Sequence, residues 1–281
     1  MKLVLLTSLV VAATCTSRNP LHFKEGHDVT HVGSHEPHQI PHIFHQSWKD
    51  EDVPEKYAQW RASWIELHPG WEFKLWTDED NEALVTEQYP WFKDTYDSFA
   101  KPVMKADASR VLYLHHYGGV YADLDFEALK NVEPLLADRH VLLAAVTKED
   151  SSRHETQPIP NAWMASVRHH PFWLFALQTI IKAAGCVDTS ELLFVESTTG
   201  PIMLNRALKA YDRVNGTGIT VLDPGLIYPI DWEDTLFITN ETPEENEHAL
   251  CAPTSQHFDD NKCKSRFPDA YAITYWTHTW G

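Results

Sequence analysis

Segments typical of strands and helices alternate from Ile40 onward, and this alternation leaves few folds open to the chain. The apolar run IPHIFHQSW (40–48) predicts a buried strand, and aromatic residues at helical spacing then predict a helix that ends at a Pro-Gly pair. The alternating segment WEFKLWTD (71–78) predicts a second strand, and Thr77 and Asp80 have the spacing of a capping box for another helix. A β-α-β-α order predicts an α/β fold with a parallel sheet, whose ligands bind at the carboxyl ends of the strands.

The next helix and strand bring four charged residues toward that edge of the sheet. In KPVMKADASRVLYLHHYGG, Asp107 and Arg110 lie three residues apart on one helical face, and either glycine at the end suits a left-handed cap. VYADLD then predicts a strand, on which Asp123 and Asp125 leave one face while Leu124 points into the core. Two like charges held this close need a cation.

Taken separately, neither pair of charged residues is specific. An Asp and an Arg three residues apart on a helix most often form a surface ion pair, and a bare D-x-D most often ends a solvated strand. The interpretation as a functional site therefore rests on their combination.

The overall charge excludes one class of function. The chain has 281 residues, of which 23 are basic and 40 are acidic, and its formal charge is −17. A protein that binds nucleic acid through bulk positive potential needs the opposite balance, so we expect no nucleic-acid partner. Any anionic ligand must instead be met locally, by a metal ion or by a few well-placed cations.

The first part of the chain has the character of a targeting segment and a stem. Residues 1–17, MKLVLLTSLVVAATCTS, contain too short an apolar run to span a bilayer and predict a secretory signal peptide or a short signal anchor. Residues 18–39 are polar and rich in histidine, which predicts a disordered stem, with metal binding by that tract as the alternative. One folded domain then covers residues 40–281. The sequons at Asn215 and Asn240 agree with a luminal or extracellular setting.

The cysteines are interpreted in that oxidising setting. Cys251 and Cys263 are expected to form a disulfide that closes a small loop, which leaves Cys186 as a free thiol. The alternative is a pair of reduced thiols that lie near one another.

Five segments occur in an order known from one enzyme family: IPHIFHQSWK, HPGWEFKLWTD, YPWFKDTYDSF, KADASRVLYLHHYGGVYADLD and STTGP. They resemble the DXD-containing glycosyltransferases of family 32, densely from Ile40 to about Leu136 and thinly afterwards. Within the family, the chain resembles the fungal inositol-phosphorylceramide mannosyltransferases and, less strongly, the initiating α-1,6-mannosyltransferases of the Golgi. The resemblance implies a GT-A fold over residues 40–281, which is a Rossmann-like nucleotide-sugar-binding fold with a mixed, mostly parallel sheet flanked by helices.

The resemblance also implies an activity that suits the charged residues. Family members transfer a sugar from a nucleotide diphosphate with retention of configuration, aided by Mn²⁺ or Mg²⁺, and carboxylates are the ligands that such hard cations take. By correspondence, Asp123 and Asp125 hold the metal, and Asp123 also meets the donor. Asp107 and Arg110 correspond to the pair that holds the donor's sugar. All four residues are therefore expected to be catalytic.

The expected substrates follow from the same resemblance. Charge-assisted bonds from an Asp and an Arg favour a hexose nucleotide but do not distinguish mannose from glucose or galactose. The likeness to mannosyltransferases makes GDP-mannose the expected donor, and a glycolipid such as inositol-phosphorylceramide, or a glycan, the expected acceptor. The expected location is the secretory pathway, in the Golgi lumen or in peripheral contact with the Golgi membrane, or outside the cell.

Four further positions follow from the family pattern. Gln46 and Trp48, at the end of the first strand, are expected near the nucleotide base, although core packing explains Trp48 nearly as well. Trp280 corresponds to the last tryptophan of the family's closing motif and is expected to contact the donor, and a polar residue shortly before it reaches the metal or pyrophosphate in that motif. Where members carry an earlier histidine this chain has Thr274–Tyr275, so His278 is either the substitute metal ligand or a packed surface residue.

Two other functions compete with this interpretation. Haloacid-dehalogenase phosphohydrolases also place D-x-D at a strand end, but this chain has Glu127 where their motif carries Thr or Val, and its motif follows several βα units. A non-catalytic luminal carbohydrate-binding or effector protein would keep the fold without turnover, and the intact charged residues weigh against it.

The segment STTGP (197–201) lies on the acceptor side in the transferase interpretation, or is simply the start of a helix.

Overall fold

The computed structural model describes residues 39–146, 158–186, 190, 193–214, 216–232, 242 and 247–277. The predicted leader, nearly all of the predicted stem and the two sequon asparagines lie outside these residues, as do His278 and Trp280. The described residues all belong to one compact unit, His35–Gly281. Within this described part, no helix is both long enough and apolar enough to cross a membrane.

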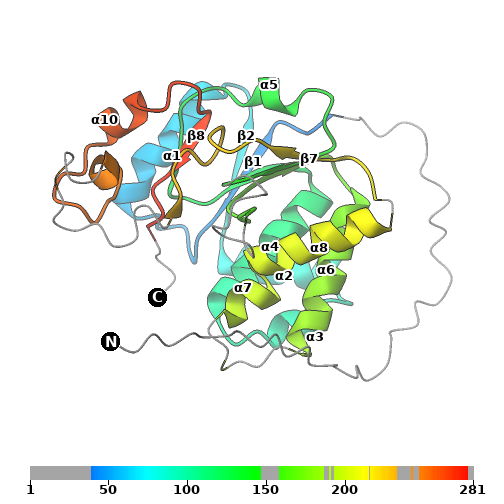
Figure 1. Ribbon diagram of the computed structural model, residues 1–281. Helices are drawn as coiled ribbons and strands as arrows, with labels where there is room; N and C mark the ends of the chain where they lie inside the picture. Colours follow the sequence, from blue (N-terminus) through cyan, green and yellow to red (C-terminus); the bar gives the residue numbers. More distant parts are fainter. Residues whose placement is uncertain are drawn as a thin grey trace, which may run out of the picture. The chain divides into compact units, whose positions relative to one another are not determined.

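A six-stranded mixed sheet with the strand order β2-β1-β3-β6-β5-β7 forms the centre of this unit (Figure 1). Its strands are β1 (Ile43–Ser47), β2 (Glu72–Trp76), β3 (Gly119–Ala122), β5 (Val141–Ala144), β6 (Trp163–Ser166) and β7 (Ile219–Leu222). Strand β6 runs antiparallel to both of its neighbours, whereas the other pairs are parallel. A second, two-stranded antiparallel sheet pairs β4 (Phe126–Ala128) with β8 (Ala272–Thr274).

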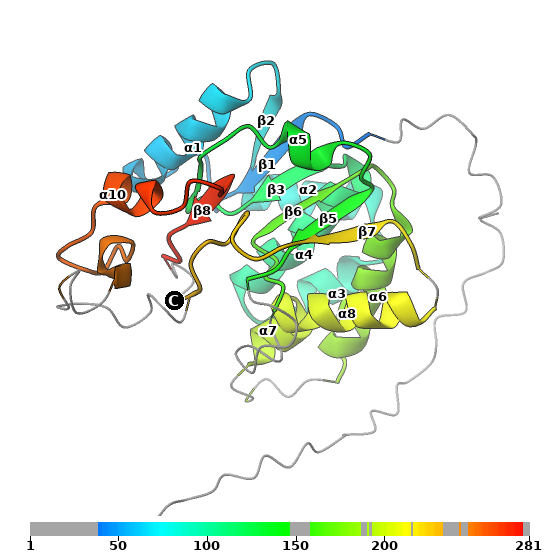
Figure 2. The same ribbon diagram turned by 45° about the horizontal axis from the view of Figure 1, so that its top comes forward.

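Helices flank the sheet on both faces (Figure 2). They are α1 (Glu55–Leu67), α2 (Asp78–Gln88), α3 (Lys93–Asp97), α4 (Pro102–His116), α5 (Glu133–Leu136), α6 (Pro171–Ala184), α7 (Phe194–Thr198), α8 (Pro201–Arg213), the 3₁₀ turn η1 (Glu247–Leu250) and α10 (Asp260–Ser265). Strand β3 shows the two-residue alternation of a strand buried on both faces. Tyr121 packs with Tyr113 of α4, whereas Val120 and Ala122 pack in a separate cluster with Trp64 of α1. This is the architecture expected of the GT-A fold, and that prediction is confirmed.

The helix boundaries follow local sequence signals. Helix α2 begins with the predicted capping box, in which the Asp80 amide donates to Thr77 Oγ1 at 3.1 Å and the Thr77 amide donates to Asp80 Oδ2 at 2.9 Å. Helix α8 begins at Pro201, whose missing N–H is not needed in a first helical turn. Both starts agree with the sequence analysis.

Two glycines connect α4 to β3 where no other residue would fit. Gly118 and Gly119 have φ values of 65° and 95°, in the left-handed region that side chains with a Cβ atom avoid. A Cβ atom on Gly119 would lie 2.4 Å from the Ile43 carbonyl oxygen, and one on Gly118 would lie 2.8 Å from the Ser166 carbonyl oxygen. The glycines therefore let β3 start directly against β1 and β6.

Strand β3 is shorter than the sequence analysis predicts, because it ends at Ala122 and not at Asp125. The Asp123 amide still donates to the Ala162 carbonyl at 2.9 Å, but the Phe126 amide then bonds back to the Asp123 carbonyl at 3.2 Å. This turn leads the chain into β4. Asp123 and Asp125 consequently lie at the carboxyl end of β3, in the turn that follows the strand.

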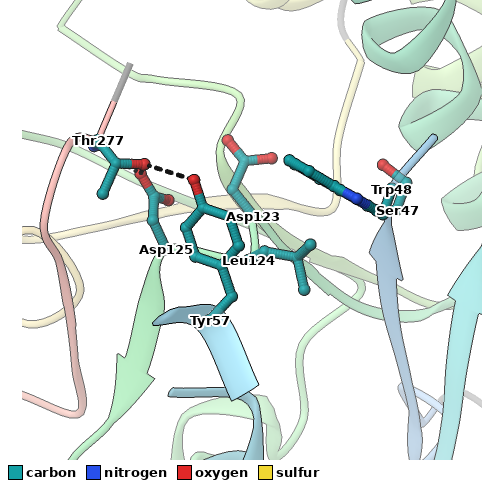
Figure 3. Close-up of a pocket in the computed structure, with 7 residues that line it drawn as sticks. All are labelled: Ser47, Trp48, Tyr57, Asp123, Leu124, Asp125 and Thr277. Carbon is teal, nitrogen blue, oxygen red and sulfur yellow. Dashed lines mark hydrogen bonds between the residues drawn. The ribbon is translucent and has the colours of Figure 1, made fainter. Parts of the chain in front are cut away.

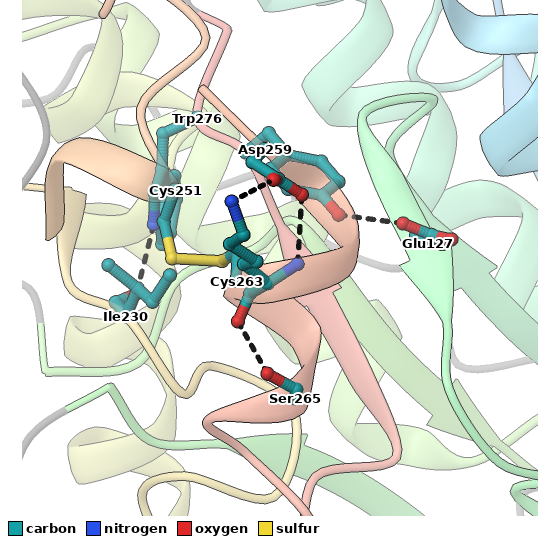
Figure 4. Close-up of a disulfide and its surroundings, with 9 residues drawn as sticks. Glu127, Ile230, Cys251, Asp259, Cys263, Ser265 and Trp276 are labelled. Atoms are coloured by element: carbon teal, nitrogen blue, oxygen red, sulfur yellow. Dashed lines mark hydrogen bonds and ion pairs between the residues drawn. A yellow bond between two sulfur atoms is a disulfide. The ribbon is translucent and has the colours of Figure 1, made fainter. Parts of the chain in front are cut away.

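The predicted disulfide between Cys251 and Cys263 is present, with a Cα–Cα distance of 5.1 Å (Figure 4). It joins the segment after η1 to helix α10, and both cysteines are buried. The prediction of a free thiol at Cys186 is wrong, because Cys186 is also disulfide-bonded. The sequence analysis treated Cys186 as the cysteine left over from one pair.

Replacing Cys251 and Cys263 together with alanine should lower the free energy of unfolding. The two residues are separated by 12 positions, and the lost constraint on the unfolded chain corresponds to about 3 kcal/mol. Urea denaturation measures the change, and mass spectrometry of unreduced wild-type peptides checks that the two cysteines are linked. A double variant with the wild-type urea midpoint would contradict a stabilising role for this bond.

Candidate active site

The two aspartates of the D-x-D motif lie side by side at the carboxyl end of β3, between two cavities (Figure 3). Leu124, between them, is 5% exposed and packs into a hydrophobic cluster with Trp60 and Tyr275. The prediction that Leu124 enters the core while both carboxylates share one side is confirmed. The geometry comes from a turn and not from a strand.

A buried arginine links the helix pair to the motif. The Arg110 side chain on α4 is 2% exposed, and its guanidinium lies 3.2 Å from Asp107 Oδ1 and 3.1 Å from Asp123 Oδ1. It also donates to the Asn161 carbonyl at 3.0 Å and lies over the Tyr121 ring, 4.7 Å from its centroid. Burial lowers the pKa of Arg110, but the neighbouring acidic groups, Asp123 first, outweigh burial and raise it, so the guanidinium stays charged.

Asp123 is held by a second donor. The Tyr121 hydroxyl donates to Asp123 Oδ1 at 2.6 Å, which is the same oxygen that meets Arg110. Burial raises the pKa of Tyr121 well above its usual value, so the hydroxyl keeps its proton and remains a donor. The orientation of the Asp123 carboxylate is therefore determined from two directions.

Asp107 uses both of its oxygens within the protein. Asn161 Nδ2 donates to Oδ1 at 2.9 Å, and the Thr199 hydroxyl donates to Oδ2 at 3.0 Å. Burial raises the pKa of Asp107, and Arg110 and these two donors oppose that shift. Asp107 and Arg110 line neither cavity, whereas Asn161 does. The structure thus brings the predicted sugar-holding pair next to the motif but places it beneath Asn161 and Asp123.

Asp125 is met by the C-terminal segment. Asp125 Oδ2 accepts from the Thr277 amide at 2.9 Å and from the Thr277 hydroxyl at 3.2 Å. The Tyr57 hydroxyl lies 3.2 Å from the same threonine oxygen (Figure 3). Burial and the adjacent charge of Asp123 raise the pKa of Asp125 to about 6, although the Thr277 bonds oppose the shift. Burial and a neighbouring like charge both disfavour the ionised form of a carboxyl group, and a bound cation would oppose this shift.

The two cavities differ in size and chemistry. The β1-side pocket is small and is lined by Ser47, Trp48, Tyr57, Asp123, Leu124, Asp125 and Thr277, with the Trp48 ring directed toward Asp123 (Figure 3). The α7-side cavity is about 250 Å³ in volume and is lined by Asp123, Asp125, Pro160, Asn161, Ala162, Leu193, Glu196, Pro201, Trp232, Thr274 and Trp276. Trp48 thus lies beside the motif, and its contact with a nucleotide base stays a prediction. Gln46 is 1% exposed and lines neither cavity.

Among the described residues, the carboxylates of Asp123 and Asp125 are the groups placed to hold a metal ion. Within the described part of the chain, no group of three or more His, Cys, Asp or Glu side chains lies close enough to hold an ion. A Mg²⁺-like ion is commonly bound by one or two carboxylates, with water and substrate phosphates completing its coordination. The pair suits an ion that binds together with a phosphorylated substrate.

Residues 54–142 match the family described as the glycosyltransferase sugar-binding region containing a DXD motif. This part of the chain belongs to that family. The DXD motif of the matched region is Asp123-Leu124-Asp125, and the same region contains the Asp107–Arg110 pair. The resemblance inferred from the sequence segments is confirmed.

Several fungal proteins are similar to the chain over more than half of its length. The chain is 37% identical over 194 residues to the mannosyl phosphorylinositol ceramide synthase SUR1 of Saccharomyces cerevisiae. The aligned residues cover 67% of this chain and 47% of that protein. It is 38% identical over 198 residues to the inositol phosphoceramide mannosyltransferase 1 of Schizosaccharomyces pombe. That alignment covers 69% of this chain and 58% of that protein. The chain thus spans about half the length of the curated relatives it matches.

Other similarities are weaker. The initiation-specific α-1,6-mannosyltransferase of Candida albicans is 27% identical over 111 residues, which cover 37% of this chain and 29% of that protein. The solved structure of the PaToxG glycosyltransferase overlaps 63% of this chain and 71% of its own, with a TM-score of 0.47 and 15% identity.

Asn161, Tyr57 and Thr277 were not among the predicted site residues, whereas Thr199 was expected on the acceptor side, which stays a prediction. Thr199 lies in the quoted segment STTGP, but no feature of that segment marks it as a partner of Asp107. Thr277 lies in the closing aromatic segment, where a polar residue near the metal was expected at position 278. Nothing in the local sequence around Asn161 or Tyr57 marks either as part of the site.

Replacing Arg110 with methionine should lower the free energy of unfolding by about 3–5 kcal/mol, because the buried Asp107 and the largely buried Asp123 lose their shared cation. Chemical denaturation measures this. Lys93→Met is the matched control, since Lys93 also meets two carboxylates, of Glu82 and Asp97, but at the surface where water screens them. Similar losses of unfolding free energy in both variants would show that burial of the Arg110 cluster does not increase its contribution to stability.

Proposed function

We propose that the protein is a metal-dependent, retaining glycosyltransferase that transfers mannose from GDP-mannose to a glycolipid of the inositol-phosphorylceramide kind, or to a glycan. One observation carries the proposal: Asp123 and Asp125 lie together at the carboxyl end of β3, on the border of both cavities. Ligands of open α/β sheets bind at this edge. The names of the similar fungal proteins, several of them mannosyltransferases, support the choice of sugar.

The carboxylate pair fits a divalent cation. Arg110 and Tyr121 bond to Oδ1 of Asp123, and Thr277 bonds to Oδ2 of Asp125. Each carboxylate thus uses one oxygen in the hydrogen bonds and ion pairs of the described residues and has the other available. Bound Mn²⁺ or Mg²⁺ would supply positive charge to the diphosphate as it leaves the sugar. His278 and Trp280 remain proposed as a metal ligand and a donor contact.

The donor extends from one cavity to the other in this proposal. The nucleoside lies over the mouth of the small β1-side pocket, against Trp48, whose Nε1 proton has no partner among the described residues. The diphosphate lies at the aspartates, and the sugar enters the α7-side cavity next to Asn161. Gln46 carries a buried amide nitrogen without a partner among the described residues, and we retain it as a contact from beneath.

The charged helix pair has a supporting role in this arrangement. Arg110 and Asp107 orient Asp123 and Asn161, which are the groups that face the donor. Preorganised groups need no rearrangement when the sugar leaves its phosphate. In this proposal Asp107 and Arg110 are positioning residues. They hold the sugar indirectly, through Asn161 and Asp123.

The proposed setting is the secretory pathway, with a Golgi location and peripheral membrane contact as its specific form. The Cys251–Cys263 disulfide supports an oxidising compartment. The proposed layout keeps a leader at residues 1–17, a stem at 18–39 and one catalytic domain at 40–281. Nucleic acid is not a partner in this proposal, given the formal charge of −17.

Asp125→Ala should reduce nucleotide release from the donor by about a thousandfold, because the leaving diphosphate loses its charge stabilisation. The variant should keep the wild-type unfolding midpoint. Calorimetric titration of Mn²⁺ in the presence of GDP gives a second measurement, in which binding should be lost. The control is Asp94→Ala, which removes an exposed carboxylate of α3. Full wild-type activity in excess chelator, or normal turnover by Asp125→Ala, would refute the metal role.

Among nucleotide sugars, GDP-mannose should be consumed fastest. The test incubates the protein and Mn²⁺ separately with GDP-mannose, UDP-glucose, UDP-galactose and UDP-N-acetylglucosamine and measures nucleotide release. Faster turnover of any UDP-sugar would overturn the donor assignment and leave the glycosyltransferase proposal intact. No release from any donor, with or without metal, would count against the transferase proposal itself.

A further inference from the structure

Much of the lining of the α7-side cavity is apolar. Its apolar lining consists of Pro160, Ala162, Leu193, Pro201, Trp232 and Trp276. Leu193 is 39% exposed, so it marks the rim, whereas Asn161 is 9% exposed and lies deep beside the motif. The cavity therefore has an inner end at the aspartates and an outer end at the rim near α7.

Trp276 adopts a backbone conformation that costs free energy. Its φ is 47°, in the left-handed region, which is uncommon for a bulky residue. Three contacts hold it there: its indole N–H donates to the Ile230 carbonyl at 3.0 Å (Figure 4), its amide donates to Thr274 Oγ1 at 3.3 Å, and its ring stacks on Tyr228 at 5.6 Å and 16°. Strain kept by this many contacts is typical of residues placed for a ligand.

Trp276 belongs both to an aromatic stack and to the lining of the cavity. The ring stacks on Tyr228, and the residue is only partly buried and lines the cavity. Such a fixed aromatic face is suited to the C–H face of a sugar or polyol ring, whose hydroxyl groups point outward around its edge.

The lining of the same cavity also includes a hydrogen-bond acceptor, the carboxylate of Glu196. It lies in α7 and lines the same cavity. A Cβ atom on Gly200 would lie only 2.9 Å from the Glu196 Cα atom, so the close approach of the α7–α8 turn holds the Glu196 backbone in place. A carboxylate in this position accepts hydrogen bonds from ring hydroxyls.

The charge of the cavity restricts what enters it. Its lining includes three carboxylates, those of Asp123, Asp125 and Glu196, and among the described lining residues there is no Lys or Arg. Arg110, which lies beneath, is already shared by Asp107 and Asp123. An anionic substituent at the outer end would meet the like charge of Glu196 and no cation among the described lining residues, so a neutral polyhydroxylated ring is favoured there.

We propose that the outer end of this cavity is the acceptor subsite, in which Trp276 stacks on a neutral polyol or sugar ring and Glu196 orients its hydroxyl groups. The inference rests on the proposed function. In the transfer, an acceptor hydroxyl oxygen bonds to the anomeric carbon, the bond from that carbon to the diphosphate breaks, and the hydroxyl proton passes to a diphosphate oxygen. Glu196 positions the hydroxyl without joining the covalent change. Any phosphate carried by the acceptor lies outside the cavity.

The test compares Trp276→Ala, Trp276→Phe and Glu196→Gln with two matched controls, Trp91→Ala and Glu66→Gln. Trp91 is a partly exposed tryptophan and Glu66 an exposed glutamate, and both lie away from the cavity. With GDP-mannose and Mn²⁺, transfer to myo-inositol is followed by mass spectrometry, and donor hydrolysis is followed without acceptor. Trp276→Ala should raise the KM for myo-inositol about tenfold, a factor typical of losing an aromatic contact. Trp276→Phe should retain most affinity.

Binding gives a readout that does not depend on turnover. Saturation-transfer NMR of myo-inositol, on protein loaded with GDP and Mn²⁺, should show a signal in the wild type and both controls that weakens in Trp276→Ala and Glu196→Gln. An equal loss of hydrolysis and transfer in Trp276→Ala would assign the whole cavity to the donor and overturn the inference. Stronger binding of myo-inositol 1-phosphate within the cavity than of myo-inositol would overturn its charge argument. Trp276-dependent binding of myo-inositol without turnover of any donor would support the subsite and refute the transferase function.

Discussion

A buried positive charge organises the site. Arg110 is removed from water together with Asp107, and buried charges are tolerated only when they are paired and hydrogen-bonded. The guanidinium satisfies one carboxylate on its own helix and one at the end of β3, and it also reaches the Asn161 carbonyl. Its position thereby fixes the distance between helix α4, the D-x-D turn and the segment that leads into β6.

Other parts of the site are built outward from this cluster. Asp107 holds Asn161 on one side and Thr199 on the other, so the deep end of the α7-side cavity and the α7–α8 turn are both tied to α4. The glycine at position 200 permits that approach, since a side chain there would meet the Glu196 backbone. Helix α4 thus fixes the relative positions of the D-x-D turn, the deep end of the α7-side cavity and the α7–α8 turn.

The opposite border of the site depends on the second sheet. Pairing of β8 with β4 brings the C-terminal segment to the turn that carries the motif, where Thr277 bonds to Asp125. Glu127 of β4 reinforces this junction, because it accepts from Tyr275 at 2.6 Å and from Lys264 of α10 at 2.6 Å. The Cys251–Cys263 disulfide holds α10 against the preceding segment. Residues far from the motif in sequence therefore decide how its second carboxylate is oriented.

The sequence alone was enough to predict the α/β class, the first strands, the capping box at Thr77, the glycine turn after α4 and the pairing of Asp123 with Asp125. These features depend on residues within a few turns of one another, where periodicity and backbone preference act directly. The family resemblance likewise rests on contiguous segments, and the matched region confirms it.

Only the tertiary structure decided how these parts act together. The partners of Asp107 and Asp125 are Thr199 and Thr277, which lie 92 and 152 positions away, and no local pattern announces them. The same holds for the end of β3 at Ala122, which follows from the turn toward β4, and for the disulfide at Cys186. Burial of Arg110 is likewise set by segments that pack over it, and an i,i+3 pair has the same sequence spacing whether it is solvated or enclosed. Sequence spacing therefore predicted which charges share a face, whereas the long-range packing determined which of them meet water, each other or a ligand.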